Sequence, residues 1–122
     1  MRKTARQSGF TLIELLIVLG VIVLLASFVF PNVLASRAKA NDLAARAYGK
    51  QLFGHVTAWV AEQPGDSTSH LLPDCTAPQY LAQGAPSSPP LGVTKCQVQQ
   101  LGSARYLVRV TTVNGKVFDF NQ

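Results

Sequence analysis

Glu14 is the residue of this 122-residue chain whose type and position most suggest chemistry, because it is a carboxylate inside an apolar run. No charged side chain occurs between Leu15 and Ser36, and leucine, isoleucine, valine and phenylalanine dominate that stretch. An ionisable group within a membrane is costly, so it is a functional candidate that needs a partner. The alternative is that Glu14 lies near the membrane interface and reaches the water around the lipid headgroups.

A partner for Glu14 arises if the chain is cut between Gly9 and Phe10. The cut would remove a basic leader, residues 1–9, which contains three cations and no anion. It would also give Phe10 a free α-amine. The amine of a neighbouring subunit could then pair with Glu14 inside a bundle of helices, and an unpaired carboxylate would favour assembly.

The apolar run is long enough to cross a membrane. As a helix, Phe10 to Phe30 would measure about 31 Å, close to the ~30 Å hydrocarbon thickness of a bilayer. The basic leader predicts a cytoplasmic N-terminus and an exported remainder. A secretory signal peptide removed near Ala35 fits less well, because its apolar region would be shorter and without an acid. A plain anchor on an unrelated domain is the other alternative.

Residues 9–18, GFTLIELLIV, resemble the N-terminus of type IV prepilins, which follows a short basic leader ending in glycine. The resemblance covers about residues 2 to 40, including Pro31. It implies cleavage after Gly9 by a prepilin peptidase, N-methylation of Phe10, and a role for Glu14 in guiding each subunit into a helical filament. It also implies a single-pass bacterial inner-membrane protein before assembly and an extracellular pilus afterwards.

Beyond the apolar run, the sequence predicts that the helix continues in amphipathic form. Pro31 removes one helical hydrogen bond and predicts a kink, and in the family the segment before this proline can lose helicity in the filament. Apolar residues then recur at three- and four-residue spacing at Ala45, Tyr48, Leu52, Val56 and Trp59. A proline and a glycine after Gln63 predict the end of the helix. We therefore expect one helix over residues 10–61, with residues 10–30 in the membrane or the filament core.

Residues 62–122 are expected to form a small globular head. Its first part, residues 64–92, is rich in proline and glycine and is predicted to be a loop, exposed at residues 85–90. A β-meander over residues 93–121 follows, with strands at 93–101, 105–113 and 116–121. The expected fold class is α+β and pilin-like, with the apolar half of the long N-terminal helix transmembrane and its amphipathic half packed on a small antiparallel sheet.

The last two strands are predicted to form a hairpin. Asn114-Gly115 is typical of a two-residue type I′ turn, in which Thr112 would face Val117. In that register apolar residues fall on both faces of the sheet. One face carries Tyr106, Val108 and Val110, and the other carries Leu107, Val113, Phe118 and Phe120.

The chain has two cysteines, Cys75 and Cys96, and the predicted topology puts both outside the cytoplasm, where disulfides persist. A disulfide between them would stabilise the small head by about 3 kcal/mol. Two free thiols or a metal pair are the alternatives, although a two-cysteine metal site would lack nearby histidines. Many pilins have a disulfide that closes a C-terminal loop. Here both cysteines precede the final hairpin, so the pair departs from that pattern.

No catalytic, metal or cofactor site is expected. Ser67, Ser69, His70 and Asp74 include the residue types of a nucleophilic triad, but they crowd one loop without a scaffold to fix their geometry. The other histidine, His55, lies beside the apolar stripe that recurs along the predicted helix from Ala45 to Trp59. The sequence has no phosphate-binding glycine loop, no zinc-ligand spacing and no acidic calcium loop.

The expected function is that of a structural subunit that polymerises with itself into a type IV pilus for twitching motility, adhesion or DNA uptake. Its other partners would be the prepilin peptidase and the pilus assembly machinery. A minor pilin or a type II secretion pseudopilin is the alternative. A DNA-binding pilus component, with contacts from Lys95, Arg105, Arg109 and Lys116, is the weaker one. Loss of the leader lowers the formal charge from +5 to +2, which argues against a strong nucleic-acid footprint.

Overall fold

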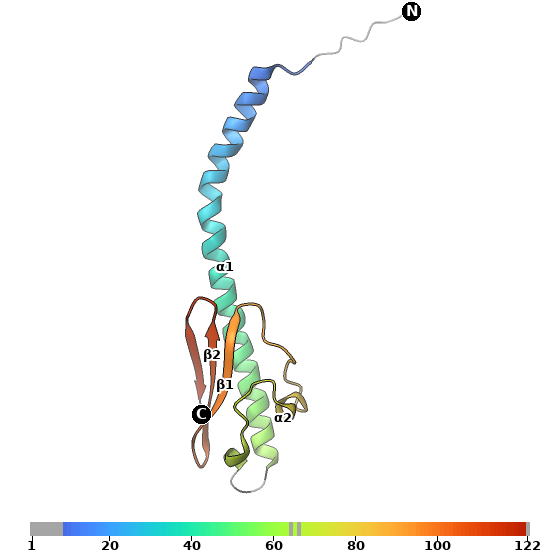
Figure 1. The fold of residues 1–122 in the computed structure, drawn as a ribbon, viewed down its shortest axis with the longest axis vertical. Helices are drawn as coiled ribbons and strands as arrows, with labels where there is room; N and C mark the ends of the chain where they lie inside the picture. The colour runs from blue at the N-terminus through green and yellow to red at the C-terminus, as the bar shows by residue number, and fades with distance from the viewer. Residues whose placement is uncertain (1–8, 64, 66, 122) are drawn as a thin grey trace, which may run out of the picture. The chain divides into compact units, whose positions relative to one another are not determined.

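The computed structural model describes residues 9–63, 65 and 67–121 (Figure 1). Most of the predicted leader, residues 1–8, lies outside the described residues, as do Pro64 and Asp66 of the predicted helix stop. The elements in chain order are helix α1 (Leu12–Glu62), the 3₁₀ helix η1 (Ser67–His70), helix α2 (Pro78–Leu81) and strands β1 (Val93–Gly102), β2 (Arg105–Thr112) and β3 (Val117–Asn121). A long helix with a three-stranded antiparallel sheet confirms the expected α+β, pilin-like fold class.

The chain divides into two compact units, residues 1–36 and residues 37–122. In the described part of the first unit, the large apolar side chains from Phe10 to Leu34 are all exposed. All of them except Phe10 belong to α1, which is long and apolar enough to cross a membrane. Pro31 lies inside α1, and the side chain of Asn32 donates a hydrogen bond to the carbonyl oxygen of Phe28 at 3.3 Å. The kink at Pro31 stays a prediction.

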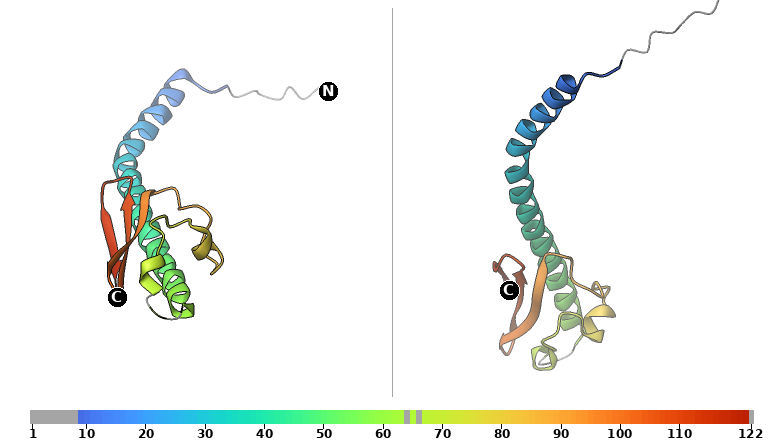
Figure 2. Two further views of the ribbon diagram at one scale, coloured as in Figure 1. Left: turned by 60° about the horizontal axis from the view of Figure 1, so that its bottom comes forward. Right: turned by 45° about the horizontal axis from the view of Figure 1, so that its top comes forward.

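In the second unit, the sheet lies against the C-terminal part of α1, and the segment before β1 packs at the other side of that helix (Figures 1 and 2). The strands run in the order β1-β2-β3, each antiparallel to its neighbour. The predicted stripe on α1 is confirmed, because four of its members are fully or almost fully buried: Ala45, Tyr48, Leu52 and Val56. They form one core with the face of β2 that carries Tyr106, Val108 and Val110.

The predicted register of the β2–β3 hairpin is wrong by one residue. Val117 pairs with Thr111 rather than with Thr112. A type I′ turn needs positive φ at both central residues, whereas Gly115 has φ +77° and no described residue other than glycine has a positive φ. The N–H of Gly115 donates to the carbonyl oxygen of Thr112 at 3.0 Å, and the N–H of Thr112 donates to that of Lys116 at 2.8 Å. The loop therefore has three residues and ends in a glycine bulge.

This one-residue shift moves Phe118 and Phe120 to the face of the sheet that packs on α1. A slip of one residue exchanges the two faces of a strand, and Phe118 now pairs with Val110 and Phe120 with Val108. The ring of Phe120 lies where a side chain at Gly49 would project. A Cβ atom there would be 2.2 Å from the Cε2 atom of Phe120. The prediction that these phenylalanines lie on the opposite face is thus wrong.

The proline-rich segment predicted as a loop contains two short helices, η1 and α2, and supplies part of the core. Tyr80 in α2 is fully buried, and its hydroxyl donates to the carbonyl oxygen of Leu72 at 2.8 Å. Pro78 occupies the first turn of α2, where its missing N–H leaves no hydrogen bond unmade. Ala85 is also buried, so only the later part of the predicted exposed stretch is open to solvent, at Ser87, Ser88 and Pro89.

Candidate functional site: the N-terminal segment and the head

Glu14 lies in the first turn of α1 and caps the helix. The backbone N–H of Thr11 donates to the Oε2 atom of Glu14 at 2.9 Å, and the N–H of Glu14 donates to the Oγ1 atom of Thr11 at 3.4 Å. This reciprocal arrangement is a capping box, which satisfies N–H groups that a helix start leaves unpaired. The spacing Thr-x-x-Glu before an apolar run is its sequence signal, so a helix start at Leu12 rather than Phe10 was predictable.

The predicted cleavage position lies just before this cap. Gly9 and Phe10 precede the helix, and the side chain of Phe10 is 81% exposed. The backbone on both sides of the Gly9–Phe10 bond is therefore outside regular secondary structure. Cleavage at this bond, methylation of Phe10 and pairing of Glu14 with an amine stay predictions.

The two cysteines form a disulfide in the structure, with a Cα–Cα distance of 5.7 Å. Cys75 is almost completely buried. Beside it, the N–H of Val98 donates to the carbonyl oxygen of Pro73 at 2.9 Å, and Asp74 forms a β-bridge with Gln97. The disulfide therefore attaches the segment before β1 to the outer edge of that strand.

Two of the four cations proposed as a DNA-contacting patch are held by carboxylates. The Nε and Nη2 atoms of Arg109 donate to the two carboxylate oxygens of Asp119 at 2.7 and 2.8 Å. Lys116 forms a salt bridge with Asp42 of α1. Because these ion pairs compensate half of the patch, the charges favour a solvated face over a phosphate-binding surface.

Asp42 connects α1 to the β2–β3 hairpin through contacts with Asn114 and Lys116. It is only 9% exposed, and its Oδ1 atom accepts a hydrogen bond from the side-chain amide of Asn114 at 3.4 Å. The hydrogen bond from Lys116 is the main cause that lowers the pKa of the Asp42 carboxyl below its ordinary value of 3.8. Burial opposes this shift and is outweighed.

This lowered pKa predicts how the stability of the second unit depends on pH. A carboxyl with a lower pKa in the folded state stabilises the fold above its unfolded pKa, and this contribution is lost as the pH falls through the folded value. We expect the melting temperature to be steady above about pH 5 and to fall below about pH 4. Asp42→Asn should lower the melting temperature at pH 7 and flatten the acid limb. Identical pH profiles of wild type and variant in circular dichroism melts would contradict this assignment.

Of the residues with triad chemistry, Asp74 is engaged in contacts within its own segment. The Oδ1 atom of Asp74 accepts hydrogen bonds from the backbone N–H and the hydroxyl of Thr76 at 2.8 and 2.7 Å, which places it in a local turn. His55, on α1, has a buried Nε2 atom without a hydrogen-bond partner among the described residues. Within residues 9–63, 65 and 67–121, no group of three or more histidine, cysteine or acidic residues is arranged to hold a metal ion.

Comparison with known proteins finds a family match for the N-terminal segment. Residues 4–30 match the family described as the prokaryotic N-terminal methylation motif. The chain carries a prokaryotic N-terminal methylation motif. Gly9, Phe10 and Glu14 all lie within this motif, and Pro31 follows directly after it.

Three relatives each match about a third of the chain. Over 40 residues, the chain is 58% identical to the type IV wide pilus major component PilA4 of Thermus thermophilus. The matched region is 33% of this chain and 30% of that protein. The chain is 45% identical over 42 residues to the type II secretion system core protein G of Vibrio cholerae, covering 34% of this chain and 29% of that protein. The Escherichia coli protein of the same description is 46% identical over 41 residues. The matched region is 34% of this chain and 28% of that protein.

The likeness to each relative covers about a third of this chain. The chain spans less than a third of the length of each of these relatives. No solved structure matches the chain. The relatives are described as a pilus component and as type II secretion core proteins, and the comparisons do not distinguish between these two roles.

Proposed function

We propose that the chain is the precursor of a filament subunit that polymerises through its N-terminal helix into an extracellular type IV pilus. The observation that carries the proposal is the methylation motif at residues 4–30, whose part from Leu12 onward lies on a helix whose most apolar stretch buries no side chain within the chain itself. Exposed apolar surface of this extent is a site of interaction with a membrane or with other subunits.

In the proposed pathway, this apolar surface contacts lipid before assembly and neighbouring subunits after assembly. Before assembly, residues 10–30 lie in the inner membrane, with the leader, residues 1–9, in the cytoplasm. A prepilin peptidase cuts the Gly9–Phe10 bond, and Phe10 is methylated. After extraction by the assembly machinery, residues 10–30 pack against the same segment of neighbouring subunits. The apolar contacts to lipid are thereby replaced by helix–helix packing.

The remainder of the chain supplies the outer part of the filament in this proposal. The N-terminal region that contains α1 is assigned to residues 10–61 and the head to residues 62–122. The Thermus relative is described as a major component of a wide pilus, which favours a subunit of the pilus shaft. Twitching motility, adhesion and DNA uptake are the uses proposed for such a pilus.

A pseudopilin of a type II secretion system is the second candidate. Two of the three relatives are described as core protein G of such a system, and their identities to this chain are 45% and 46%. The two candidates share the processing steps and differ in what the polymer does and in how much of it reaches the cell surface.

The abundance of the protein in surface filaments separates the two candidates. We expect quantitative mass spectrometry of filaments sheared from wild-type cells to find this chain as the main protein, because a shaft subunit is repeated along the whole fibre. A matched preparation from cells without the prepilin peptidase is the control and should contain none. If the chain is a trace component, or if its deletion blocks protein secretion but leaves the filaments unchanged, the pilus assignment is wrong.

A further inference from the structure

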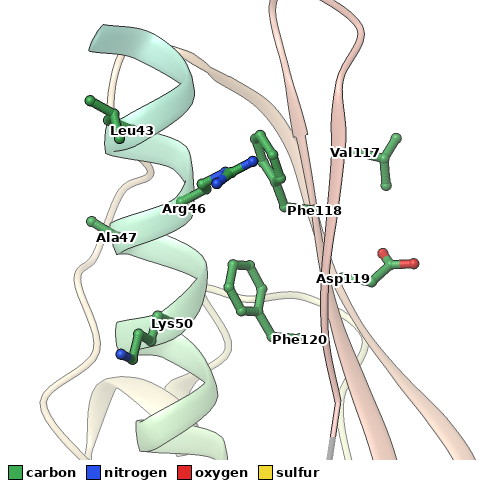
Figure 3. A pocket seen from close by; sticks show the side chains of 8 residues that line it. All are labelled: Leu43, Arg46, Ala47, Lys50, Val117, Phe118, Asp119 and Phe120. Carbon is green, nitrogen blue, oxygen red and sulfur yellow. The ribbon is translucent and has the colours of Figure 1, made fainter. Parts of the chain in front are cut away.

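A groove runs between the C-terminal part of α1 and strand β3 (Figure 3). The side chains of Phe118 and Phe120 point from β3 toward the helix, whereas those of Val117 and Asp119 point away from it. The remaining lining comes from α1, at Leu43, Arg46, Ala47 and Lys50. Leu43 is 65% exposed, so the groove presents apolar surface to solvent beside two cations.

In the part of the chain that the structure describes, strand β3 pairs with β2 alone, and its other edge, along this groove, is unpaired. It is the last strand of the sheet, and the hydrogen bond between Thr112 and Lys116 fixes the alternation of the β2–β3 ladder. By that alternation, the backbone N–H and C=O groups of Val117, Asp119 and Asn121 point away from β2. The opposite edge of the sheet is covered, because the N–H of Val98 in β1 donates to the carbonyl oxygen of Pro73.

The groove carries two cations, Arg46 and Lys50, and Arg46 has a Coulomb interaction with Asp42, whose carboxylate is already paired with Lys116. The guanidinium of Arg46 lies over the ring of Phe118, 4.7 Å from its centroid. Neither Arg46 nor Lys50 is in a salt bridge within the part of the chain that the structure describes. The one acid that lines the groove, Asp119, points away from the helix and is neutralised by Arg109.

We propose that this groove and the edge of β3 bind an extended acidic segment of a partner protein, which adds a fourth strand to the sheet. The free backbone groups of Val117 and Asp119 provide the hydrogen bonds of strand addition. A glutamate on the groove side of the added strand packs its methylene groups against a phenylalanine ring. Its carboxylate reaches Arg46 or Lys50.

The edge strand of a second copy does not have this chemistry. The groove side of β3 carries Phe118 and Phe120, and its acid, Asp119, lies on the other face. Pairing of two β3 strands would therefore bring aromatic rings and no carboxylate toward the cations. Charge complementarity favours a different protein as the partner.

The test measures binding of a fluorescent ten-residue peptide in which threonine and glutamate alternate. The protein is the full chain in detergent micelles, and the reference peptide replaces each glutamate with lysine. We expect saturable binding of the acidic peptide that weakens with added salt, and no binding of the basic one. Lys50→Gln combined with Arg46→Gln should weaken binding about tenfold, as expected for the loss of two surface ion pairs. Lys95→Gln, a cation outside the groove, should leave it unchanged.

A second pair of variants tests the strand edge. Val117→Pro removes the N–H group that points outward, and proline is tolerated at the first position of an edge strand. It should abolish peptide binding, whereas Val117→Thr keeps the N–H group and should bind normally. Circular dichroism checks that all variants remain folded. Equal binding of the acidic and basic peptides would overturn the proposal. So would retention of binding in a folded Val117→Pro protein, or wild-type dimers that this variant disrupts.

Discussion

Cells that produce only the Glu14→Val variant are expected to contain mature, membrane-inserted subunit but almost no surface filaments. The variant keeps the apolar helix and the Gly9–Phe10 bond, so insertion and cleavage should proceed. It removes the carboxylate that the proposed assembly step pairs with the amine of a neighbouring Phe10. Loss of one partner leaves the other charge buried and unpaired, and we expect filament yield to fall by at least about tenfold. Immunoblots of sheared filaments and of membranes measure both pools.

Glu14 has a second role as part of the capping box. Variants that separate the helix cap from the charge are therefore the matched controls for this experiment. Glutamine in place of Glu14 still reaches back to the N–H of Thr11, so it keeps the helix cap while it removes the charge. Thr11→Ala keeps the charge and removes the hydroxyl that accepts from the N–H of Glu14. If pairing of the charge drives assembly, Glu14→Gln fails like Glu14→Val, and Thr11→Ala assembles. Normal filaments from Glu14→Gln would reject the pairing mechanism and assign Glu14 to the helix start.

Removal of the disulfide is expected to lower the free energy of unfolding of the second unit by about 3 kcal/mol. The bond joins the segment before β1 to β1 itself, and it lies within a core that also contains Tyr80. Without it, the segment from η1 to α2 is held by the packing of Tyr80, by the hydrogen bonds of the buried Thr68 to Gly102 and Ser103, and by a few backbone hydrogen bonds. Denaturant unfolding of the full chain in detergent, for wild type and for the double variant Cys75→Ser, Cys96→Ser, measures the difference.

Reductant provides the control for this prediction. It should destabilise the wild type by a similar amount and leave the double serine variant unaffected. Thiol labelling of the native, non-reduced protein should fail at both cysteines. A double variant as stable as the wild type, or a disulfide-linked dimer, would contradict the assigned role of the bond.

The elements that depend on local periodicity could be predicted from the sequence. The spacing of Ala45, Tyr48, Leu52 and Val56 indicated the buried stripe, and the end of α1 at Glu62 follows from the proline and glycine just beyond it. The apolar run alone predicts that α1 starts at Phe10, whereas the Thr-x-x-Glu signal predicts the observed start at Leu12. The methylation motif was recognisable because its residues are contiguous.

Features that depend on long-range contacts could not be predicted in the same way. An Asn-Gly pair suits both a two-residue turn and a three-residue turn with a glycine bulge, so it does not fix the register alone. Lys116 and Asp42 form a salt bridge in the observed register, but they lie 74 residues apart in the chain. The groove between α1 and β3 could not be predicted from the sequence. The predicted β2–β3 register places Phe118 and Phe120 on the face of the sheet away from α1. The burial of Tyr80 likewise depends on partners outside its own segment.

The central claim is that this chain is processed at its methylation motif and assembled through the new N-terminus. Intact-mass and N-terminal peptide analysis of the protein in sheared surface filaments tests it most directly. The account predicts a chain that begins at Phe10 and carries one methyl group on its α-amine. A chain from the same filaments that begins at Met1, or one cut near Ser36, would contradict it.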